Sequence, residues 1–169
     1  VRGVRVAVLK HAHHDFDIDK PGKDSYRLRK SGAAQMLIAS NQRWALMTET
    51  QQPTDFEILL DQFNHAELDL IIVEGFKGKA IPKIELHRAS LGHSLICMSE
   101  GQYYTDHACG YAGSTDVREE LPKLAGGFIA VASDSELALP DGISALDINQ
   151  PEQIAAFIHQ VYMKNCGAP

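Results

Sequence analysis

Five short runs of mainly apolar residues constrain the fold of this chain more than any other feature of its sequence. They lie at residues 4–10, 68–73, 83–87, 128–132 and 145–148. The first run shows little alternation of apolar and polar residues, which is typical of a strand buried on both faces of a parallel sheet, and the fourth is also predicted to be a buried strand. Helical segments lie between several runs, so the sequence predicts an α/β fold, a three-layer α/β/α sandwich with a mostly parallel sheet.

A hairpin and three helices complete the predicted architecture. The hairpin strands are predicted at 34–40 and 43–48, and the helices at 24–31, 55–64 and 151–164. Asp24 and Thr54 are expected to cap the first two helices, since short polar side chains satisfy free helical N–H groups. Trp44 is expected to be a core residue. Residues 92–127, rich in Gly, Ser and Tyr, are predicted to be an inserted excursion in a single domain spanning 1–169.

The composition of the chain argues against two classes of binding partner, nucleic acids and membranes, and against a disulfide framework. A net charge of -6 argues against a general nucleic-acid binder, which would be expected to show a basic stripe. No apolar run approaches the roughly 20 residues that span a bilayer, so no membrane association is expected. The three cysteines have no CxxC spacing, which favours reduced thiols in the cytoplasm over a disulfide framework.

The loop after the first run concentrates ionisable groups where α/β proteins bind ligands. Its members are His11, His13, His14, Asp15, Asp17, Asp19, Lys20 and Lys23, with Lys10 at the end of the run. The histidines and acids could bind a transition metal. Alternatively, acids such as Asp15 and Asp19 could bind Mg²⁺ while the lysines bind a phosphate. The lysines favour the phosphate interpretation, and a solvated acidic loop remains the simpler alternative.

The segment KPGKDS, at residues 20–25, is a candidate anion site. Lys20 and Lys23 flank a Pro-Gly turn immediately before a helix start at Asp24 or Ser25. Exposed backbone N–H groups and two ammonium groups at a helix start attract anions. A loop kept soluble by lysines is the alternative.

Glu74 follows the run at 68–73 directly. A strand that ends in an acid is typical of the second acidic motif of P-loop nucleotide hydrolases, where the carboxylate binds the Mg²⁺ water shell or orients the attacking water. Gly75 would let the backbone approach a ligand, and Lys77 could bind phosphate. Asp134, after the run at 128–132, occupies the position where guanine-binding P-loop proteins place a carboxylate against the N1 and N2 donors of the base. Ordinary strand ends are the alternative for both.

These segments, in the same order over most of the chain, resemble the molybdopterin-guanine dinucleotide biosynthesis protein B family, MobB. The resemblance rests on KHAHHDFDIDKPGKDSYRLRKSGA, IASNQRWALMTE, LDLIIVEGFK, IAVASD and LDIN. It implies a P-loop GTP-binding fold, a homodimer, at most a weak GTPase, and a role as an adaptor to the guanylyltransferase. It also implies that Glu74 lies near Mg²⁺. Residues facing nucleotide or pterin phosphates would be Lys10, His11, Asp15, Asp19, Lys20, Lys23 and Asp24.

The family's GxxxxGK[ST] loop does not occur in residues 1–169. Without it the chain has no backbone cradle for the β- and γ-phosphates, and the family's first strand is expected to be missing from the centre of the sheet. Two hypotheses follow. One is a cytoplasmic GTP-binding accessory protein that uses Mg²⁺ and acts with the guanylyltransferase and molybdopterin. The other is a non-catalytic module that binds a molybdopterin-type ligand or a partner enzyme through residues 10–31. A metal-dependent hydrolase using the His–Asp loop ranks lower.

Overall fold

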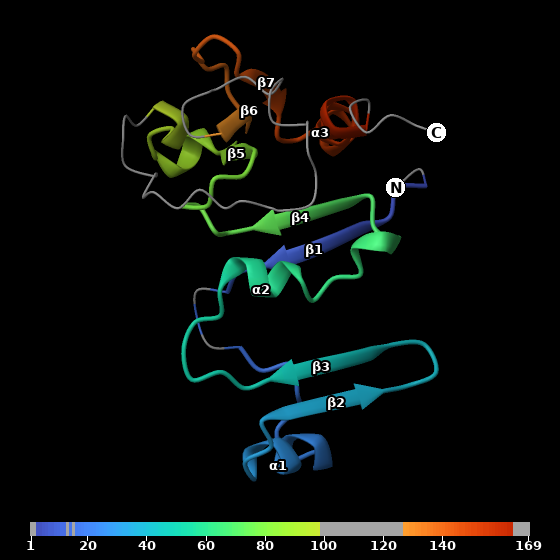
Figure 1. Ribbon diagram of the computed structural model, residues 1–169. Helices are drawn as coiled ribbons and strands as arrows, with labels where there is room; N and C mark the ends of the chain where they lie inside the picture. Colours follow the sequence, from blue (N-terminus) through green and yellow to red (C-terminus); the bar gives the residue numbers. More distant parts are fainter. Residues whose placement is uncertain (1–2, 13, 15, 99–126, 164–169) are drawn as a thin grey trace. The chain divides into compact units, whose positions relative to one another are not determined.

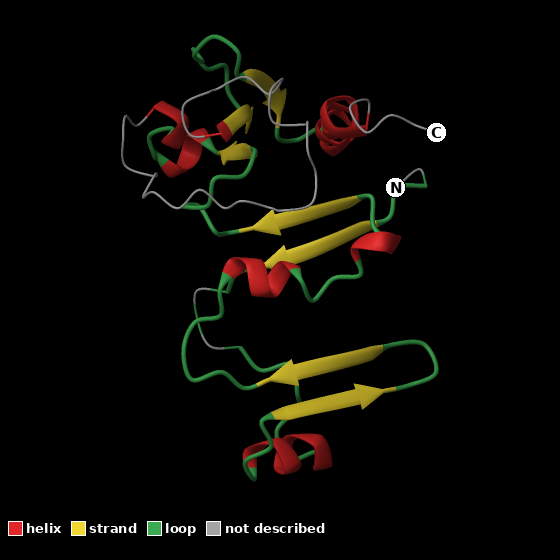
Figure 2. Cartoon of the chain, in the orientation of Figure 1, coloured by secondary structure: helices red, strands yellow, loops and turns green. Residues whose placement is uncertain are grey.

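The computed structural model describes residues 3–12, 14, 16–98 and 127–163 of the chain. Along these residues helical segments separate some of the strands, while β2 and β3, β4 and β5, and β6 and β7 follow one another directly (Figures 1 and 2). The chain divides into two compact units, Val1–Phe76 and Lys77–Pro169, which are described separately below. The single domain over 1–169 stays a prediction. Most of the predicted excursion at 92–127 lies outside the described residues.

The first unit contains a parallel pair of strands, β1 (Val6–Lys10) and β4 (Leu70–Glu74). Both strands were predicted, but β4 extends to Glu74, so this acid is the last strand residue and not the first residue after the strand. The register pairs Val6 with Leu70 and Lys10 with Glu74. The carboxyl ends of β1 and β4 therefore meet at one edge, which is where parallel sheets place their ligands.

An ion pair joins the start of β1 to the segment before β4. The Arg5 guanidinium donates to both carboxylate oxygens of Asp69, at 2.8 and 3.2 Å, and the Arg5 backbone N–H donates to Asp69 Oδ2 at 2.7 Å. These bonds to the Arg5 side chain and backbone lower the pKa of Asp69 to about 2.

This shift predicts a pH dependence of stability. Because the folded pKa of Asp69 lies below its usual value of 3.8, the stabilisation is present above about pH 4 and is lost as pH falls toward 2. The free energy of unfolding, measured by urea titration from pH 5 to pH 2, is expected to fall less steeply in Asp69→Asn than in the parent chain. Equal slopes would contradict the assignment.

The hairpin is formed by β2 (Gln35–Ala39) and β3 (Trp44–Thr48), which pair antiparallel as predicted. Leu37 lies opposite Leu46 and Ala39 opposite Trp44, so these four side chains share one face. Trp44 was expected in the core, but 69% of its surface is exposed. A periodic strand pattern identifies two faces and does not tell which one is covered.

Two helices precede and follow the hairpin. The helix α1 (Asp24–Lys30) contacts β2, and its N-cap is Lys23, because Asp24 is already the first helical residue. Asp55, and not Thr54, occupies the N-cap position of the helix α2 (Phe56–Leu60), without a side-chain capping hydrogen bond, and the helix is shorter than predicted. The His65 ring lies 2.9 Å from the Leu60 carbonyl oxygen, within hydrogen-bonding distance, and a short 3₁₀ turn, η1 (His65–Glu67), follows. The helix α2 therefore ends earlier than the apolar periodicity of its sequence predicts.

The second unit is built on a parallel sheet of order β5-β6-β7. Its strands are β5 (Lys83–His87), β6 (Phe128–Ser133) and β7 (Ser144–Asp147). Every residue of the central strand β6 is buried, which explains its apolar sequence from Phe128 to Ala132. Pro151 begins α3 (Pro151–Ile158), as predicted, and a π-helical stretch continues to Met163.

Glu85 anchors the segment after β5. This buried carboxylate accepts the N–H groups of Ile96 at 2.6 Å and Cys97 at 2.9 Å, at the 3₁₀ turn η3 (Ile96–Met98). Burial, and then the neighbouring Glu85, raise the pKa of the Cys97 thiol to about 11. Cys97 packs with Phe128, Val131 and Ile143 in the core of this unit, so it is an unreactive structural thiol. None of the described helices is long and apolar enough to cross a membrane.

Candidate functional site at the carboxyl ends of the parallel strands

Lys10 and Glu74 meet at the carboxyl ends of β1 and β4. The Lys10 ammonium donates to both oxygens of the Glu74 carboxylate, at 2.8 and 2.9 Å. The strand register creates this contact, since the two residues are direct partners in the parallel pair. Both side chains are 64% exposed, so the pair contributes at most about 1 kcal/mol and a ligand could open it at little cost. Once open, it offers an ammonium group to a phosphate and a carboxylate to Mg²⁺.

The turn after Glu74 is tightly constrained by His11. The His11 N–H donates to the Glu74 carbonyl at 2.9 Å, which continues the strand pairing by one residue. Gly75 has a φ of +91°, and a Cβ at this position would lie 2.8 Å from the His11 Cβ. The centroid of the His11 ring lies 4.6 Å from that of the Phe76 ring. The Phe76 ring centroid in turn lies 4.8 Å from that of Phe56 in α2. His11 therefore packs against the turn, and its predicted role toward an anion stays a prediction.

Asp17 and Asp19 have different surroundings in the loop before α1. The Ser25 hydroxyl donates to Asp19 Oδ1 at 2.8 Å, while Asp19 Oδ2 is buried and has no hydrogen-bond partner among the described residues. Asp17 Oδ1 accepts from the Arg29 guanidinium at 2.5 Å, and this bond lowers the pKa of Asp17. Asp19 Oδ2 is therefore a buried carboxylate oxygen that could contact a cation or accept from a water.

Arg29 was not singled out from the sequence. Its side chain is 8% exposed, and it donates to Asp17 in the loop and to Glu49 after β3, the latter at 2.6 Å. The two carboxylates raise the pKa of Arg29 further, with Glu49 the larger cause. Asp17 and Glu49 lie 12 and 20 residues away along the chain, so no local spacing in the sequence indicates this cluster.

The predicted anion segment, Lys20 to Ser25, forms a turn and the start of α1. The Lys23 N–H donates to the Lys20 carbonyl at 3.2 Å, and both lysine side chains are exposed. No side chain caps the first turn of α1. Asp24 stabilises that turn as an acid near a helix start, but its charge opposes a phosphate at the same place. The structure thus brings together Lys20 and Lys23, with Ser25 turned toward Asp19.

The remaining predicted residues of the first unit and of the turn after it are Lys77, Asp15 and His13. Lys77 is exposed in the turn that begins the second unit, and its predicted role toward phosphate stays a prediction. Asp15 and His13 lie outside the described residues, so the magnesium set of Asp15, Asp19 and Glu74 stays a prediction. Within the part of the chain that the structure describes, no group of three or more His, Cys, Asp or Glu side chains is arranged to hold a metal ion.

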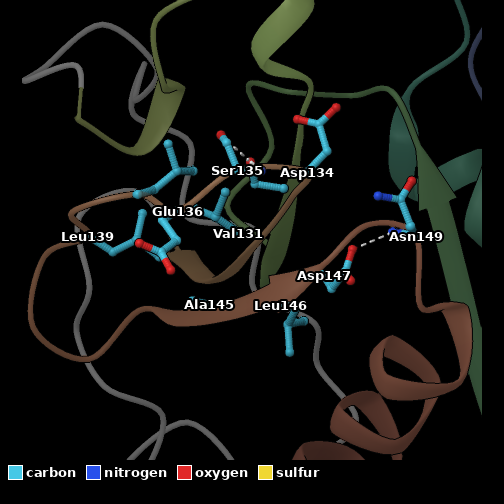
Figure 3. Close-up of a pocket in the computed structure, with 11 residues that line it drawn as sticks. Val131, Asp134, Ser135, Glu136, Leu139, Ala145, Leu146, Asp147 and Asn149 are labelled. Carbon is cyan, nitrogen blue, oxygen red and sulfur yellow. Dashed lines mark hydrogen bonds between the residues drawn. The ribbon is translucent and has the colours of Figure 1, made fainter.

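Asp134 lies directly after β6, as predicted, at the rim of a cavity of about 570 Å³ (Figure 3). The Ala89 N–H donates to Asp134 Oδ1 at 2.9 Å, and this bond is the main reason that the pKa of Asp134 is lowered. The Arg88 guanidinium lies 3.4 Å from Oδ2. The cavity is lined by Val131, Ser133, Asp134, Ser135, Glu136, Leu137, Leu139, Ala145, Leu146, Asp147 and Asn149. The sequence offered no signal for it, because its far wall is the irregular segment 135–139.

Comparison with known proteins shows the family. The sequence profile of MobB, molybdopterin guanine dinucleotide synthesis protein B, matches residues 1–105. A curated Escherichia coli (strain K12) protein named molybdopterin-guanine dinucleotide biosynthesis adapter protein is 43% identical over 168 residues, which cover 98% of this chain and 81% of the relative. The chain belongs to the MobB family. A Haemophilus influenzae relative of the same name is 37% identical over 93% of this chain and 72% of its own.

Solved MobB structures confirm the fold class. A crystal structure of molybdopterin-guanine biosynthesis protein B superposes with a TM-score of 0.59 at 22% identity, covering 95% of this chain and 82% of the other. Bacillus subtilis MobB also gives a TM-score of 0.59, at 18% identity and 94% and 81% coverage. The α/β fold predicted from the strand pattern is therefore the MobB fold, and Lys10, Glu74 and the loop before α1 all lie in the part matched by the family profile.

Proposed function

We propose that this protein is a cytoplasmic GTP-binding adapter in molybdopterin guanine dinucleotide biosynthesis, acting with the guanylyltransferase that attaches GMP to molybdopterin. The adapter role is supported by the names of relatives that the chain matches over most of their length. The single observation that carries the nucleotide site is the exposed Lys10–Glu74 pair where β1 and β4 end. It supplies both charges that a magnesium nucleotide needs.

Each candidate group has a role in this proposal. Lys10, Lys20 and Lys23 neutralise phosphate charge, and Glu74 binds the water shell of Mg²⁺. Asp19 Oδ2, buried without a partner among the described residues, fits a second oxygen contact to the ion. Mg²⁺ would bridge phosphate oxygens and offset their charge. Glu74 would also orient a water for hydrolysis, and its exposure and pairing with Lys10 are consistent with no more than a weak GTPase.

A homodimer is part of the proposal, and the hairpin supports it. Leu37, Ala39, Trp44 and Leu46 form one exposed face of β2 and β3, which we call the hairpin face. A two-stranded hairpin is marginally stable alone, and its strands carry no charged residue that would protect their edges. A second copy pairing through the same face would bury these side chains isologously.

Equilibrium binding of GTP and ATP in the presence of Mg²⁺ tests the nucleotide site. We expect GTP to bind at least about tenfold tighter than ATP, and Lys10→Ala to weaken GTP binding by about tenfold, since a charge-assisted hydrogen bond contributes about 1.5–3 kcal/mol. Arg43→Ala is the matched control, because it removes an exposed cation from the hairpin end.

A co-purification assay with the guanylyltransferase separates the two candidate functions. Association together with Lys10-dependent GTP binding supports the GTP-binding adapter. Association without any GTP binding leaves the non-catalytic module that binds a partner or a molybdopterin-type ligand. Absence of both would contradict the proposal.

A further inference from the structure

Arg29 uses only part of its hydrogen-bonding capacity. The Nε and Nη2 groups of an arginine lie side by side and can bind one carboxylate or phosphate through two parallel hydrogen bonds. Arg5 does this with Asp69, since its Nε and Nη2 donate to the two carboxylate oxygens at 3.2 and 2.8 Å. Arg29 gives Asp17 Oδ1 only its Nη2, whereas its Nε is buried and has no hydrogen-bond partner among the described residues. The Nε–Nη2 edge of Arg29 is therefore half occupied.

The rest of the Arg29 guanidinium is held in place. Its Nη1 donates to Glu49 at 2.6 Å, and the Arg29 side chain is only 8% exposed. The Asp17 side chain is 37% exposed and lies in the loop before α1, so it is the more accessible member of its pair with Arg29. If the Asp17 carboxylate moved away, Glu49 would still fix the guanidinium, and the Nε–Nη2 edge would be open to a ligand.

Lys30 adds a second cation that acts on the Asp17 carboxylate. The hydrogen bond from Arg29 is the main cause of the lowered pKa of Asp17, and the charge of Lys30 contributes to it. The Lys30 ammonium and the Arg29 guanidinium each lie 5.6 Å from the centroid of the Tyr26 ring, and the Lys30 side chain is exposed. A guanidinium edge with an ammonium group suits a phosphate monoester, which carries more negative charge at neutral pH than a carboxylate does.

We propose that Arg29 is the anchor of a phosphate-monoester site that Asp17 covers in this structure. The phosphate displaces the Asp17 carboxylate, accepts from Nε and Nη2 of Arg29 with two of its oxygens, and is neutralised in part by Lys30. Glu49 keeps the guanidinium in place during the exchange. Asp17 is thus an internal competitor that keeps weakly binding anions out of the site. The inference does not rest on GTP binding at Lys10, because nucleotides and other phosphorylated small molecules carry the same group.

The affinity for inorganic phosphate tests the displacement of Asp17. Asp17→Asn keeps the shape of the side chain and removes its charge, so the internal competitor becomes weaker, because charge-assisted hydrogen bonds are stronger than neutral ones. We expect this variant to bind phosphate at least about tenfold tighter than the parent chain. An NMR titration at constant ionic strength would follow the Arg29 Nε–H signal, which is identified by its absence in Arg29→Lys. That signal should shift along the same binding curve as the backbone signals of the loop.

Two other variants separate displacement from a general effect of charge. Glu49→Gln removes the same charge from the same guanidinium but leaves Asp17 on the Nε–Nη2 edge, and should raise the affinity for phosphate by less than about threefold. Asp61→Asn removes an exposed acid at the end of α2 and should leave the affinity unchanged. Ribose 5-phosphate and GMP distinguish the sources of the phosphate group, and both should gain by the same factor as inorganic phosphate in Asp17→Asn.

Each contrary outcome has a distinct meaning. Equal gains in Asp17→Asn and Glu49→Gln would overturn the displacement, because they would show an effect of charge alone. Tighter binding that leaves the Arg29 Nε–H signal unmoved would overturn the assignment to Arg29, and a gain for GMP alone would overturn phosphate as the recognised group. If Asp17→Asn stays folded by urea unfolding and gains no affinity for phosphate, the site at Arg29 fails, while Lys10-dependent GTP binding would still support the proposed function.

Discussion

Replacing Gly75 by alanine is expected to destabilise the protein by about 2–4 kcal/mol, because two costs combine at this position. The φ of +91° is one that residues with a side chain rarely adopt, and the new Cβ would lie 2.8 Å from the His11 Cβ. Relief of that contact would move His11, whose N–H bonds to the Glu74 carbonyl, so the ends of β1 and β4 would separate.

Substitutions at two other glycines distinguish the cost of the positive φ from the cost of the close contact with His11. Gly22 has a similar φ of +86° with nothing within 4 Å of its added Cβ, and Gly78 has an open Cβ position without a positive φ in the left-handed range. Urea unfolding should therefore rank the losses as Gly75→Ala, then Gly22→Ala at about 1 kcal/mol, then Gly78→Ala near zero. Equal losses for Gly75→Ala and Gly22→Ala would show that the contact with His11 relaxes freely. GTP binding should fall most in Gly75→Ala.

Introducing a charge on the hairpin face is expected to dissociate the proposed homodimer. Trp44 is the largest exposed apolar side chain of that face, and large aromatic residues dominate binding energy when they are buried in an interface. Trp44→Glu should raise the dimer dissociation constant by at least about 30-fold, which corresponds to a hot-spot loss of about 2 kcal/mol. Sedimentation equilibrium across a concentration series would measure the change.

The control variant introduces the same negative charge at a position outside the hairpin face. Gln42→Glu adds the same charge in the turn between β2 and β3, outside the hairpin face, and should leave the dissociation constant within about threefold. A parent chain that stays monomeric at high micromolar concentration would contradict the homodimer. A dimer that survives Trp44→Glu would place the interface elsewhere.

The strands could be predicted because their apolar runs are local signals of burial. The central strand β6, with all its residues buried, and the β2–β3 hairpin both lie where the pattern of the sequence indicates. The helix α2 was predicted too long, because the His65 ring close to the Leu60 carbonyl oxygen is a contact that periodicity does not report. Trp44 was assigned to the wrong environment for a related reason, since a pattern cannot identify which face of a hairpin is covered.

The part of the candidate site that lies at strand ends was predictable from the sequence. Lys10 and Glu74 each end an apolar run, and parallel pairing alone brings such ends together. The cavity residue Glu136 lies in an irregular segment, where neither periodicity nor a motif fixes the direction of a side chain. Arg29 was missed because its two carboxylate partners come from a loop and from a strand end, and only the tertiary fold unites them.

The side chain of Arg29 also joins two regions that are distant in the sequence. One guanidinium binds Asp17, two residues before Asp19, and Glu49, the residue after β3. In the proposed GTP-binding homodimer, a nucleotide that displaces the loop would strain the Arg29 bond to Glu49, and a partner on the hairpin would strain the bond to Asp17. Thermodynamic linkage makes such an effect reciprocal: the factor by which nucleotide changes self-association equals the factor by which self-association changes nucleotide affinity.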